Sequence, residues 1–213
     1  MRIVCISDTH GLHGKLTLPK GDVLIHSGDC TNLGSVPEVT NFGFWFRSLP
    51  FAHKILVPGN HDALFEWNER LARELIEDAN THVLIDEDLR IETPERGLDV
   101  FGSPWTSPFG RWNFMATDEN RKRFWQAHSH LDHYDIVVTH GPCRSIHDSP
   151  EPGVKTGCEF QKRAIQKMKP LYHVCGHIHE GYGTKKIGAT TYVNAAIWNH
   201  GENKLNAPIV FDL

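Results

Sequence analysis

Apolar residues occur along this chain in two arrangements. Short continuous runs are typical of buried strands, whereas apolar residues that recur every three or four positions are typical of helices packed by one face. The short runs predict strands at 2–6, 22–26, 54–57, 82–85, 89–92, 98–102, 135–139, 172–175, 183–187, 190–194 and 208–213. The helical spacing predicts helices at 35–49, 65–78, 117–130 and 158–168. Because strands and helices alternate before the last strands pair locally, the pattern predicts a mixed α/β fold.

Two segments between these elements are predicted to be irregular loops. Residues 103–115 are rich in proline, glycine and aromatic residues, and residues 143–156 are mostly polar. Glycine and proline interrupt regular structure. The sequence has no linker, repeat, low-complexity block or charge run, so residues 1–213 are expected to form a single domain with a substantial core.

The composition is that of a soluble globular protein, with 39% hydrophobic and 23% charged residues. The net charge of −4 provides no broad basic field, so strong nucleic-acid binding is not expected. The five cysteines form no C-x-x-C pair, which argues against a disulfide framework and against a zinc ribbon. A reducing, cytoplasmic compartment is therefore expected. The N-terminus enters a strand without a leader, and no apolar run approaches the ~20 residues of a membrane span.

The chain contains 15 histidines, which are dispersed rather than grouped in a tag. Histidine is the commonest metal ligand and proton shuttle near neutral pH. Several histidines belong to polar clusters that directly follow five predicted strands. These clusters are Asp8-x-His10, Gly28-Asp29, Gly59-Asn60-His61-Asp62, His140-Gly141 and Gly176-His177-x-His179. Because ligands bind outside the carboxyl ends of strands in open α/β sheets, the clusters are expected to converge into one site.

The side chains of these clusters are aspartate, asparagine and histidine, with no thiolate among them. They are too many for one tetrahedral zinc ion. The set suits two divalent cations bridged by a shared carboxylate, and mixed nitrogen and oxygen donors favour Mn, Fe or Zn over Ca or Mg. Two metal ions ~3.5–4 Å apart are the usual device for in-line displacement at phosphorus. The sequence thus predicts a dinuclear metal site, with Mn²⁺ as the first choice.

The motif order D-x-H, G-D, G-N-H-D, H-G, G-H-x-H resembles the calcineurin-like metallophosphoesterase superfamily over essentially the whole chain. The stretches 21–29 and 101–105 resemble the metallophosphoesterase-domain-containing proteins related to class III cyclic-nucleotide phosphodiesterases. Serine/threonine phosphatases of the superfamily carry a different G-D motif and a Glu after the Asn-His pair, so that branch is disfavoured. The resemblance implies an α/β fold that is a four-layer αββα sandwich with two mixed β-sheets.

The resemblance also implies a role for each motif residue. Three residues would bind the first metal ion: Asp8, His10 and His179. Three would bind the second: Asn60, His140 and His177. Asp29 would bridge the two ions. The catalytic residues would be His61, which contacts the substrate phosphate and protonates the leaving oxygen, and Asp62, which orients His61.

The implied activity is a metal-dependent phosphodiesterase that hydrolyses small phosphodiesters by in-line attack of a metal-bridging hydroxide. Cyclic or other nucleotides are expected substrates, and monoesters are also considered. The alternatives are a nuclease of the same superfamily, or a nucleotide-binding regulatory module with low turnover. The acidic balance argues against the first alternative, and the complete ligand set argues against the second. The natural substrate, the physiological metal pair and the oligomeric state are left open.

Several individual residues have plainer interpretations. Asn60 could cap the following helix, and Asp62 could be a charge at a helix N-terminus. His26, in a buried strand, is expected to be a hydrogen-bonded core histidine. Asn194 ends a strand, and two orientations are considered for it: toward the site, with a hydrogen bond, or away from it.

The remaining interpretations concern loops and scattered histidines. The loop 103–115 either stacks on a substrate base or packs as a hydrophobic lid, with the lid preferred. Arg144 and His147 are candidates for the pocket wall. The group His128, His130 and His133 is expected to be a solvated helix end, because its spacing fits no single helix face. No constellation is evident in the sequence around His13, His53, His82, His147, His173 and His200.

Overall fold

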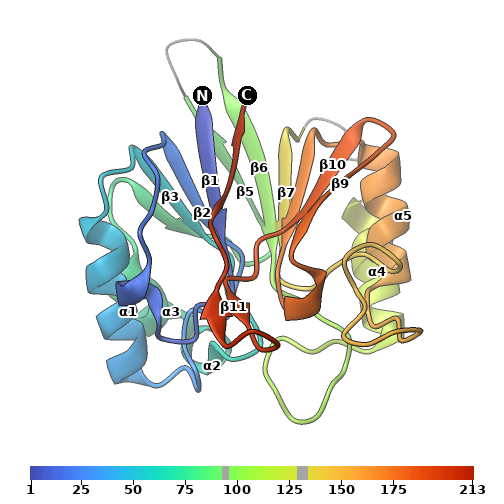
Figure 1. The fold of residues 1–213 in the computed structure, drawn as a ribbon, viewed down its shortest axis with the longest axis horizontal. Helices are drawn as coiled ribbons and strands as arrows, with labels where there is room; N and C mark the ends of the chain where they lie inside the picture. Colours follow the sequence, from blue (N-terminus) through green and yellow to red (C-terminus); the bar gives the residue numbers. More distant parts are fainter. Residues whose placement is uncertain (93–95, 129–133) are drawn as a thin grey trace.

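The computed structural model describes residues 1–92, 96–128 and 134–213, which form two β-sheets packed face to face (Figure 1). The first sheet comprises β1 (Arg2–Ile6), β2 (Val23–His26), β3 (His53–Leu56), β4 (Thr81–Val83) and β13 (Ile209–Asp212), in the order β13-β1-β2-β3-β4. The second comprises β5 (Glu87–Ile91), β6 (Leu98–Ser103), β7 (Ile136–Thr139), β8 (Tyr172–Cys175), β9 (Gly183–Ile187) and β10 (Thr190–Asn194), in the order β5-β6-β7-β8-β10-β9. A short ribbon pairs β11 (Trp198–Asn199) with β12 (Lys204–Leu205).

Helices cover the outer faces of both sheets (Figure 1). On the first sheet lie α1 (Val36–Ser48), α2 (Ala63–Trp67) and α3 (Glu69–Ile76), and on the second lie α4 (Asp118–His128) and α5 (Glu159–Met168). Two 3₁₀ turns, η1 (His13–Lys15) and η2 (His179–Gly181), complete the elements. The layers follow the order helix, sheet, sheet, helix, and both sheets mix parallel with antiparallel pairs. The predicted four-layer sandwich is therefore confirmed.

The strands are continuous apolar runs because the inner layers are buried on both faces. In β1, Ile3 and Cys5 face the core between the two sheets, whereas Val4 and Ile6 face the helical layer. All four side chains are fully buried. Strands covered on both faces lose the alternation of apolar and polar residues that one-sided sheets show.

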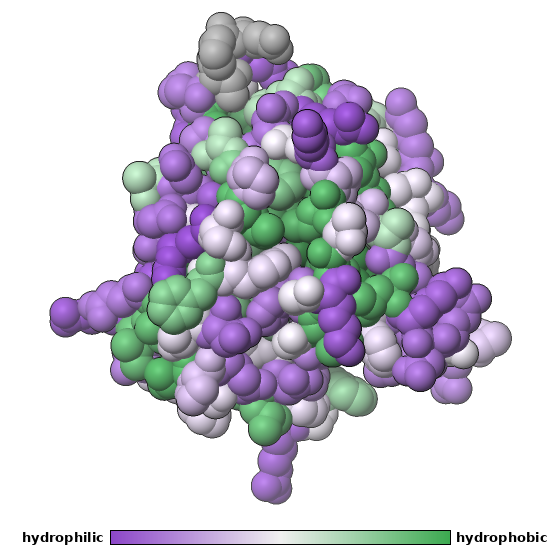
Figure 2. Space-filling model, turned by 60° about the vertical axis from the view of Figure 1, so that its left-hand side comes forward, coloured by the Kyte–Doolittle hydropathy of each residue, from purple (hydrophilic) through white to green (hydrophobic). Residues whose placement is uncertain are grey.

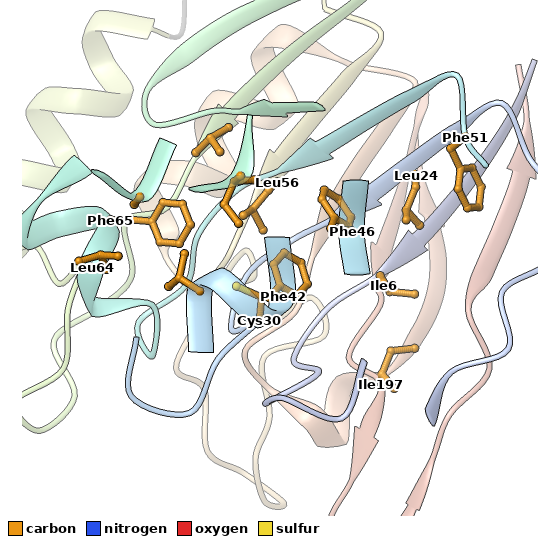
Figure 3. Packing of buried hydrophobic residues seen from close by; sticks show 14 of the residues in the cluster. Ile6, Leu24, Cys30, Phe42, Phe46, Phe51, Leu56, Leu64, Phe65 and Ile197 are labelled. Atoms are coloured by element: carbon orange, nitrogen blue, oxygen red, sulfur yellow. The ribbon is translucent and has the colours of Figure 1, made fainter. Parts of the chain in front are cut away.

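The helix α1 is held by its aromatic face (Figure 3). Phe42 and Phe46 stack with ring centroids 5.0 Å apart and lie against Leu24 and Leu56 of the first sheet. The helix begins after Ser35, whose capping box with Glu38 satisfies free amides of the first turn. The start of α1 and its buried face therefore agree with the helix predicted at 35–49.

The predicted helix 65–78 is in fact two helices, α2 and α3, which is a correction to the sequence interpretation. The break lies at Asn68, whose backbone angles, φ −148° and ψ 69°, are not helical. The amide of Asn68 bonds the Leu64 carbonyl to end α2, while its side chain accepts from the Leu71 amide to begin α3. The apolar spacing continues across the break, so periodicity alone did not reveal it. The predicted helix 117–130 is present as α4 through His128, and its last two positions lie outside the described residues.

Both sheets direct the carboxyl ends of their parallel strands to the same edge of the molecule. Strands β1, β2 and β3 are parallel, as are β7, β8 and β10. A bridge between Ser7 and Ala196 joins the first sheet to the segment after β10. The two chain termini lie at the opposite end, where the Met1 amine donates to the Leu213 carbonyl at 2.6 Å (Figure 1). The loops at the carboxyl ends thus share one surface.

The face shown in Figure 2 mixes hydrophilic and hydrophobic residues. Among the large hydrophobic side chains that the structure exposes are Phe44, Trp67 and Phe109, at 66%, 78% and 65% exposure. Within the described ranges, no helix combines the length and apolar character needed to cross a membrane.

Candidate metal centre

The five predicted clusters lie together at the carboxyl edge of the sheets. Each follows its strand directly: β1, β2 and β3 of the first sheet, and β7 and β8 of the second. Their donor atoms form three overlapping groups within 4.8 Å, namely Asp8 with His10 and His179, His10 with Asp29 and His61, and Asp29 with His140 and His177. Residues as far apart in sequence as Asp8 and His179 therefore share one site.

Asp29 lies between two sets of donors. Its Oδ1 is 3.3 Å from Nε2 of His140, and its Oδ2 is 3.9 Å from Nε2 of His10. The main chain fixes this orientation, because the His61 amide donates to Oδ1 of Asp29 at 2.8 Å. The two carboxylate oxygens thus face different sides, as a bridging carboxylate requires.

One side of the site is built around Asp8. The His177 amide donates to both carboxylate oxygens of Asp8, at 3.1 and 3.0 Å. His179 places Nε2 3.4 Å from Oδ1 of Asp8, and its other ring nitrogen is buried without a hydrogen-bond partner in the described structure. A buried imidazole nitrogen without a partner is costly unless another group binds it.

The other side is built around His140. Nδ1 of His140 donates to the Ser27 carbonyl at 2.9 Å, and Nε2 lies 3.0 Å from Oδ1 of Asn60. The His177 ring packs edge-on against His140 with centroids 4.9 Å apart. A carbonyl that holds Nδ1–H directs Nε2 toward the site, which is the usual arrangement for a ligating histidine.

Charge and burial together perturb the pKa values in this cluster. Burial alone would raise the pKa of Asp8, but its hydrogen bond to His179 and the nearby imidazoles hold it well below the usual range. Burial would also raise the pKa of Asp29, but the neighbouring His140 lowers it to about 2. Burial would lower the pKa of His140, but Asp29 raises it to about 9. Burial and His140 lower the pKa of His177 to about 4. Two ionised carboxylates are therefore buried together, a negative site that cations would balance.

The backbone around the donors is strained. Asp8, His10, Asp29 and His177 have positive φ values of 53°, 43°, 56° and 66°. Left-handed conformations cost non-glycine residues energy and gather at functional sites. These turns aim four side chains inward from strand ends.

Glycines beside the donors leave no room for a side chain. A Cβ on Gly59 would lie 2.2 Å from Oδ1 of Asp29, and one on Gly176 would lie 2.1 Å from Oδ2 of Asp8. The carboxylates of Asp29 and Asp8 therefore occupy the space that a side chain at Gly59 or Gly176 would need. The donor set, the unpartnered nitrogen of His179 and the two faces of Asp29 fit divalent cations held by nitrogen and oxygen.

His61 and Asp62 differ from the expected arrangement. Nδ1 of His61 lies 2.6 Å from the carbonyl oxygen of Asn32, and Nε2 lies 4.0 Å from Oδ2 of Asp29. The Asp62 carboxylate instead accepts from the amides of Gly59, Cys30 and Thr31 and from the Thr31 hydroxyl. In the described structure, the partner of the His61 ring is thus the Asn32 carbonyl and not Asp62. Asp62 joins the two loops that carry Asp29 and His61.

Asn194 and His26 form hydrogen bonds with the loops that carry the site residues. The side-chain amide of Asn194 donates to the Ile178 carbonyl at 2.8 Å and the Gly176 carbonyl at 3.3 Å, and so holds the loop that carries His177 and His179. His26 is fully buried, with Nε2 3.0 Å from the Thr9 hydroxyl and Nδ1 accepting from the Gly28 amide. Its expected role as a hydrogen-bonded core histidine is confirmed.

The aromatic loop 103–115 contacts the site, whereas the guanidinium of Arg144 bonds a carbonyl within its own loop, 143–156. The Trp112 ring lies 3.9 Å from the His61 ring, at 31°, so the loop contacts the site. Asn113 donates twice to the Asn60 carbonyl. Arg144 bonds the Lys155 carbonyl.

The described end of α4 is not simply solvated. His128 is half-buried, and its ring packs against Phe124 with centroids 4.2 Å apart and a tilt of 31°. His130 and His133 lie outside the described residues.

Three residues near the site had not been singled out for it: Asn32, Trp198 and His200. His200 stacks on His179 with centroids 4.6 Å apart and an interplanar angle of 12°. It belongs to the turn after β11 and not to any polar cluster behind a predicted parallel strand. The sequence shows only that His200 follows Trp198 by two positions near the C-terminus. That spacing does not indicate which part of the fold the two residues contact.

The two-sheet sandwich and the aspartate–histidine cluster at its edge define a metallophosphoesterase. The chain belongs to the calcineurin-like phosphoesterase family, whose model matches residues 1–181. This family is metal-dependent, and its membership indicates a hydrolase.

Relatives at 36% identity match the full chain. The human protein named Metallophosphoesterase domain-containing protein 1 (Homo sapiens) is 36% identical over 233 residues, which cover 100% of this chain and 71% of that protein. A UPF0046 protein from Caenorhabditis elegans is 36% identical over 236 residues, which cover 100% of this chain and 81% of that protein.

Solved structures share the fold at lower identity. Phosphopantetheinyl Hydrolase from Mycobacterium tuberculosis superposes with a TM-score of 0.64 and 16% identity, over 92% of this chain and 88% of that chain. The protein TT1561 of Thermus thermophilus gives a TM-score of 0.64 and 15% identity, over 91% of this chain and 88% of that chain. These likenesses concern the fold alone.

Proposed function

We propose that this protein is a phosphodiesterase that hydrolyses small phosphodiesters, including nucleotide esters, with two divalent cations of which Mn²⁺ is the first choice. The observation that carries the proposal is the position of Asp29, whose two oxygens face separate donor sets 3.3 and 3.9 Å away. One cation would be held by Asp8, His10 and His179, and the other by Asn60, His140 and His177. When bound, such a pair lowers the pKa of water and offsets the charge of the phosphate.

The chain itself supplies the acid. Because Nδ1 of His61 donates to the Asn32 carbonyl, Nε2 is the ring nitrogen that faces the centre. A proton carried at Nε2 can pass to the leaving oxygen of the ester. The Trp112 ring covers one face of this imidazole and limits its rotation. His61 is thus restricted to one orientation by a carbonyl and by stacking.

The proposed substrates are small because the charge balance of the chain does not favour a polyanionic polymer. The net charge of −4 gives no long-range attraction for a polyanion. A cytoplasmic setting suits the five buried free cysteines. Monoesters are a second substrate type that the same donor set accommodates.

The test is turnover of bis-p-nitrophenyl phosphate by protein stripped with EDTA and then reloaded with Mn²⁺. We expect activity only after reloading. Asp29→Ala should lose both metal ions, as measured by mass spectrometry of the metal content. His61→Ala should retain them and lose at least ~10²-fold in kcat, the usual size of general acid catalysis.

Other outcomes distinguish the rival functions. No metal-dependent turnover between pH 6 and 9 would overturn the proposal. Faster cleavage of single-stranded DNA than of small diesters would favour a nuclease, and tight AMP binding without turnover would favour a regulatory module. Equal metal loss in both variants would place His61 among the ligands.

A further inference from the structure

A cavity of about 390 Å³ opens beside the candidate metal centre. His177 and His179 form its inner wall. A phosphate held at the centre would therefore place one of its ester substituents at the mouth of this cavity. The volume lies in the lower part of the ~300–1,000 Å³ range of small-molecule sites.

The cavity wall is largely apolar. Pro108, Phe109, Pro150 and Ile178 contribute to it. Phe109 is 65% exposed although it is a large aromatic residue, so its ring is available to a ligand. Exposed aromatic rings beside a phosphate site are suited to stacking on flat groups.

The rim is braced by hydrogen bonds. The Ser107 hydroxyl donates to the Thr156 carbonyl at 3.2 Å and accepts from the buried Arg121 guanidinium at 2.7 Å. These bonds join the loop that carries Phe109 to the loop that carries Thr156. Two loops that line the cavity are therefore joined to each other by contacts within the protein.

A contact with Trp198 determines which nitrogen of the His200 ring can donate a hydrogen bond. The Trp198 indole can only donate, and it donates to Nδ1 of His200 at 2.9 Å. Nδ1 is thus an acceptor, and in the neutral ring the hydrogen is on Nε2. Because the ring also stacks on His179, it is held against the cavity of which it forms a wall.

The cavity carries one formal charge, which is negative. Glu180 lines it, and no lysine or arginine is among the described residues of its wall. A second phosphate placed away from the metal centre would meet a carboxylate and no basic side chain of the described wall. The lining therefore suits an uncharged group with hydrogen-bonding atoms.

The position of His61 tells which ester substituent would enter. His61 does not belong to the described lining of the cavity. Ring contacts run from His61 to His10 at 4.8 Å, from His10 to His179 at 5.5 Å, and from His179 to His200 at 4.6 Å. A leaving oxygen next to His61 and a substituent next to His200 would therefore lie on different sides of a phosphate held at the centre.

We propose that this cavity binds the retained ester group of a phosphodiester, and that it selects a flat, uncharged group of nucleoside size through Phe109 and His200 while Glu180 excludes a second phosphate. This inference rests on the proposed function. In the reaction, water oxygen forms the new P–O bond and the P–O bond to the leaving group breaks. The group in the cavity remains attached to phosphorus.

The test compares two diesters with the same leaving group, p-nitrophenolate. One is the p-nitrophenyl ester of thymidine 5′-monophosphate, and the other is methyl p-nitrophenyl phosphate. We expect kcat/KM to favour the thymidine ester, and the ratio of the two values to fall about tenfold in Phe109→Ala. His200→Phe, which keeps a ring for stacking but loses the donor, should also lower the ratio. Phe44→Ala, at a similarly exposed phenylalanine on α1, should not change the ratio.

A third substrate tests the charge. Thymidine 3′-phosphate 5′-(p-nitrophenyl phosphate) should react more slowly than the ester without the 3′-phosphate, and Glu180→Gln should narrow that difference. Turnover of the methyl ester with an unchanged ratio in Phe109→Ala and His200→Phe would overturn the inference while the proposed function stands. Failure to hydrolyse any of the three diesters would instead overturn the proposed function.

Discussion

Nδ1 of His61 lies 2.6 Å from the carbonyl oxygen of Asn32, and this contact joins the loop after β3 to the loop after β2. A backbone carbonyl here occupies the position in which a carboxylate partner was expected. It fixes the ring orientation without adding a charge next to the proposed acid. The nearby carboxylate of Asp62 is thereby available to hold the main chain.

We predict that Asp62→Ala lowers the free energy of unfolding of the metal-free protein by at least ~3 kcal/mol. The side chain is fully buried and accepts from three main-chain amides, and each buried amide left without a partner costs ~1–3 kcal/mol. Urea denaturation in EDTA measures this loss. Asp22→Ala, which removes one acceptor from the exposed Arg2 amide, should cost under ~1 kcal/mol. A stable Asp62→Ala protein that behaves kinetically like His61→Ala would restore the direct orienting role.

We predict that Asn194→Ala weakens metal binding by ~10–100-fold, the usual effect of losing a group that positions ligands. Its side-chain amide holds the carbonyls of Gly176 and Ile178, on either side of His177. Calorimetric titration with Mn²⁺ measures the affinity. Thr190→Ala on the same strand loses a bond to the Pro170 carbonyl far from the site and should bind Mn²⁺ normally. Equal weakening in both variants would indicate a general disturbance of β10.

We predict that Gly59→Ala abolishes both metal binding and phosphodiester hydrolysis. The added Cβ would lie 2.2 Å from Oδ1 and 2.4 Å from the amide of Asp29, so the Asp29 carboxylate must move. Gly14→Ala is the matched control, because its Cβ would meet nothing within 4 Å. The control should equal the wild type or be slightly more stable. Normal metal content in Gly59→Ala would show that Asp29 can be displaced without harm.

We predict that acid weakens the fold through His173. Burial, and then the charge of His147, lower the pKa of His173 to about 3 from the ordinary 6.5. Below pH 6.5 the unfolded chain therefore binds a proton that the folded protein does not, so stability falls as pH decreases from 6.5 toward 3. The loss is about 1.4 kcal/mol per pH unit for each such histidine.

Urea denaturation at pH 7 and pH 5 in EDTA tests the contribution of His173. His173→Gln can keep hydrogen bonds with Thr139 and Gln161, which lie 2.9 and 3.1 Å from Nε2 of the histidine, but it cannot titrate. The variant should lose less stability than the wild type between these two pH values. Identical losses would assign the acid sensitivity to other groups.

The sequence by itself determined the elements and the meeting point of the polar clusters. Buried strands are continuous apolar runs, and ligand-type residues directly after parallel strands must share an edge, since parallel strands present their carboxyl ends together. Local patterns were enough for this, because each depends on residues close in the chain. Where the pattern continued through an irregularity, as at Asn68, the sequence predicted one helix in place of two.

Only the tertiary structure decided which residues surround the clusters. The stacking of His200 on His179, of Trp112 on His61, and the Asn32 carbonyl at Nδ1 of His61 all join segments with no periodic relation. Such contacts depend on how loops and a terminal hairpin fold over the edge of the sheets. Backbone carbonyls are identical at every position, so no residue type could have indicated that the carbonyl of Asn32 holds the His61 ring. The residue types therefore predict the candidate metal donors, whereas the orientation of the His61 ring and the shape of the cavity arise from long-range packing.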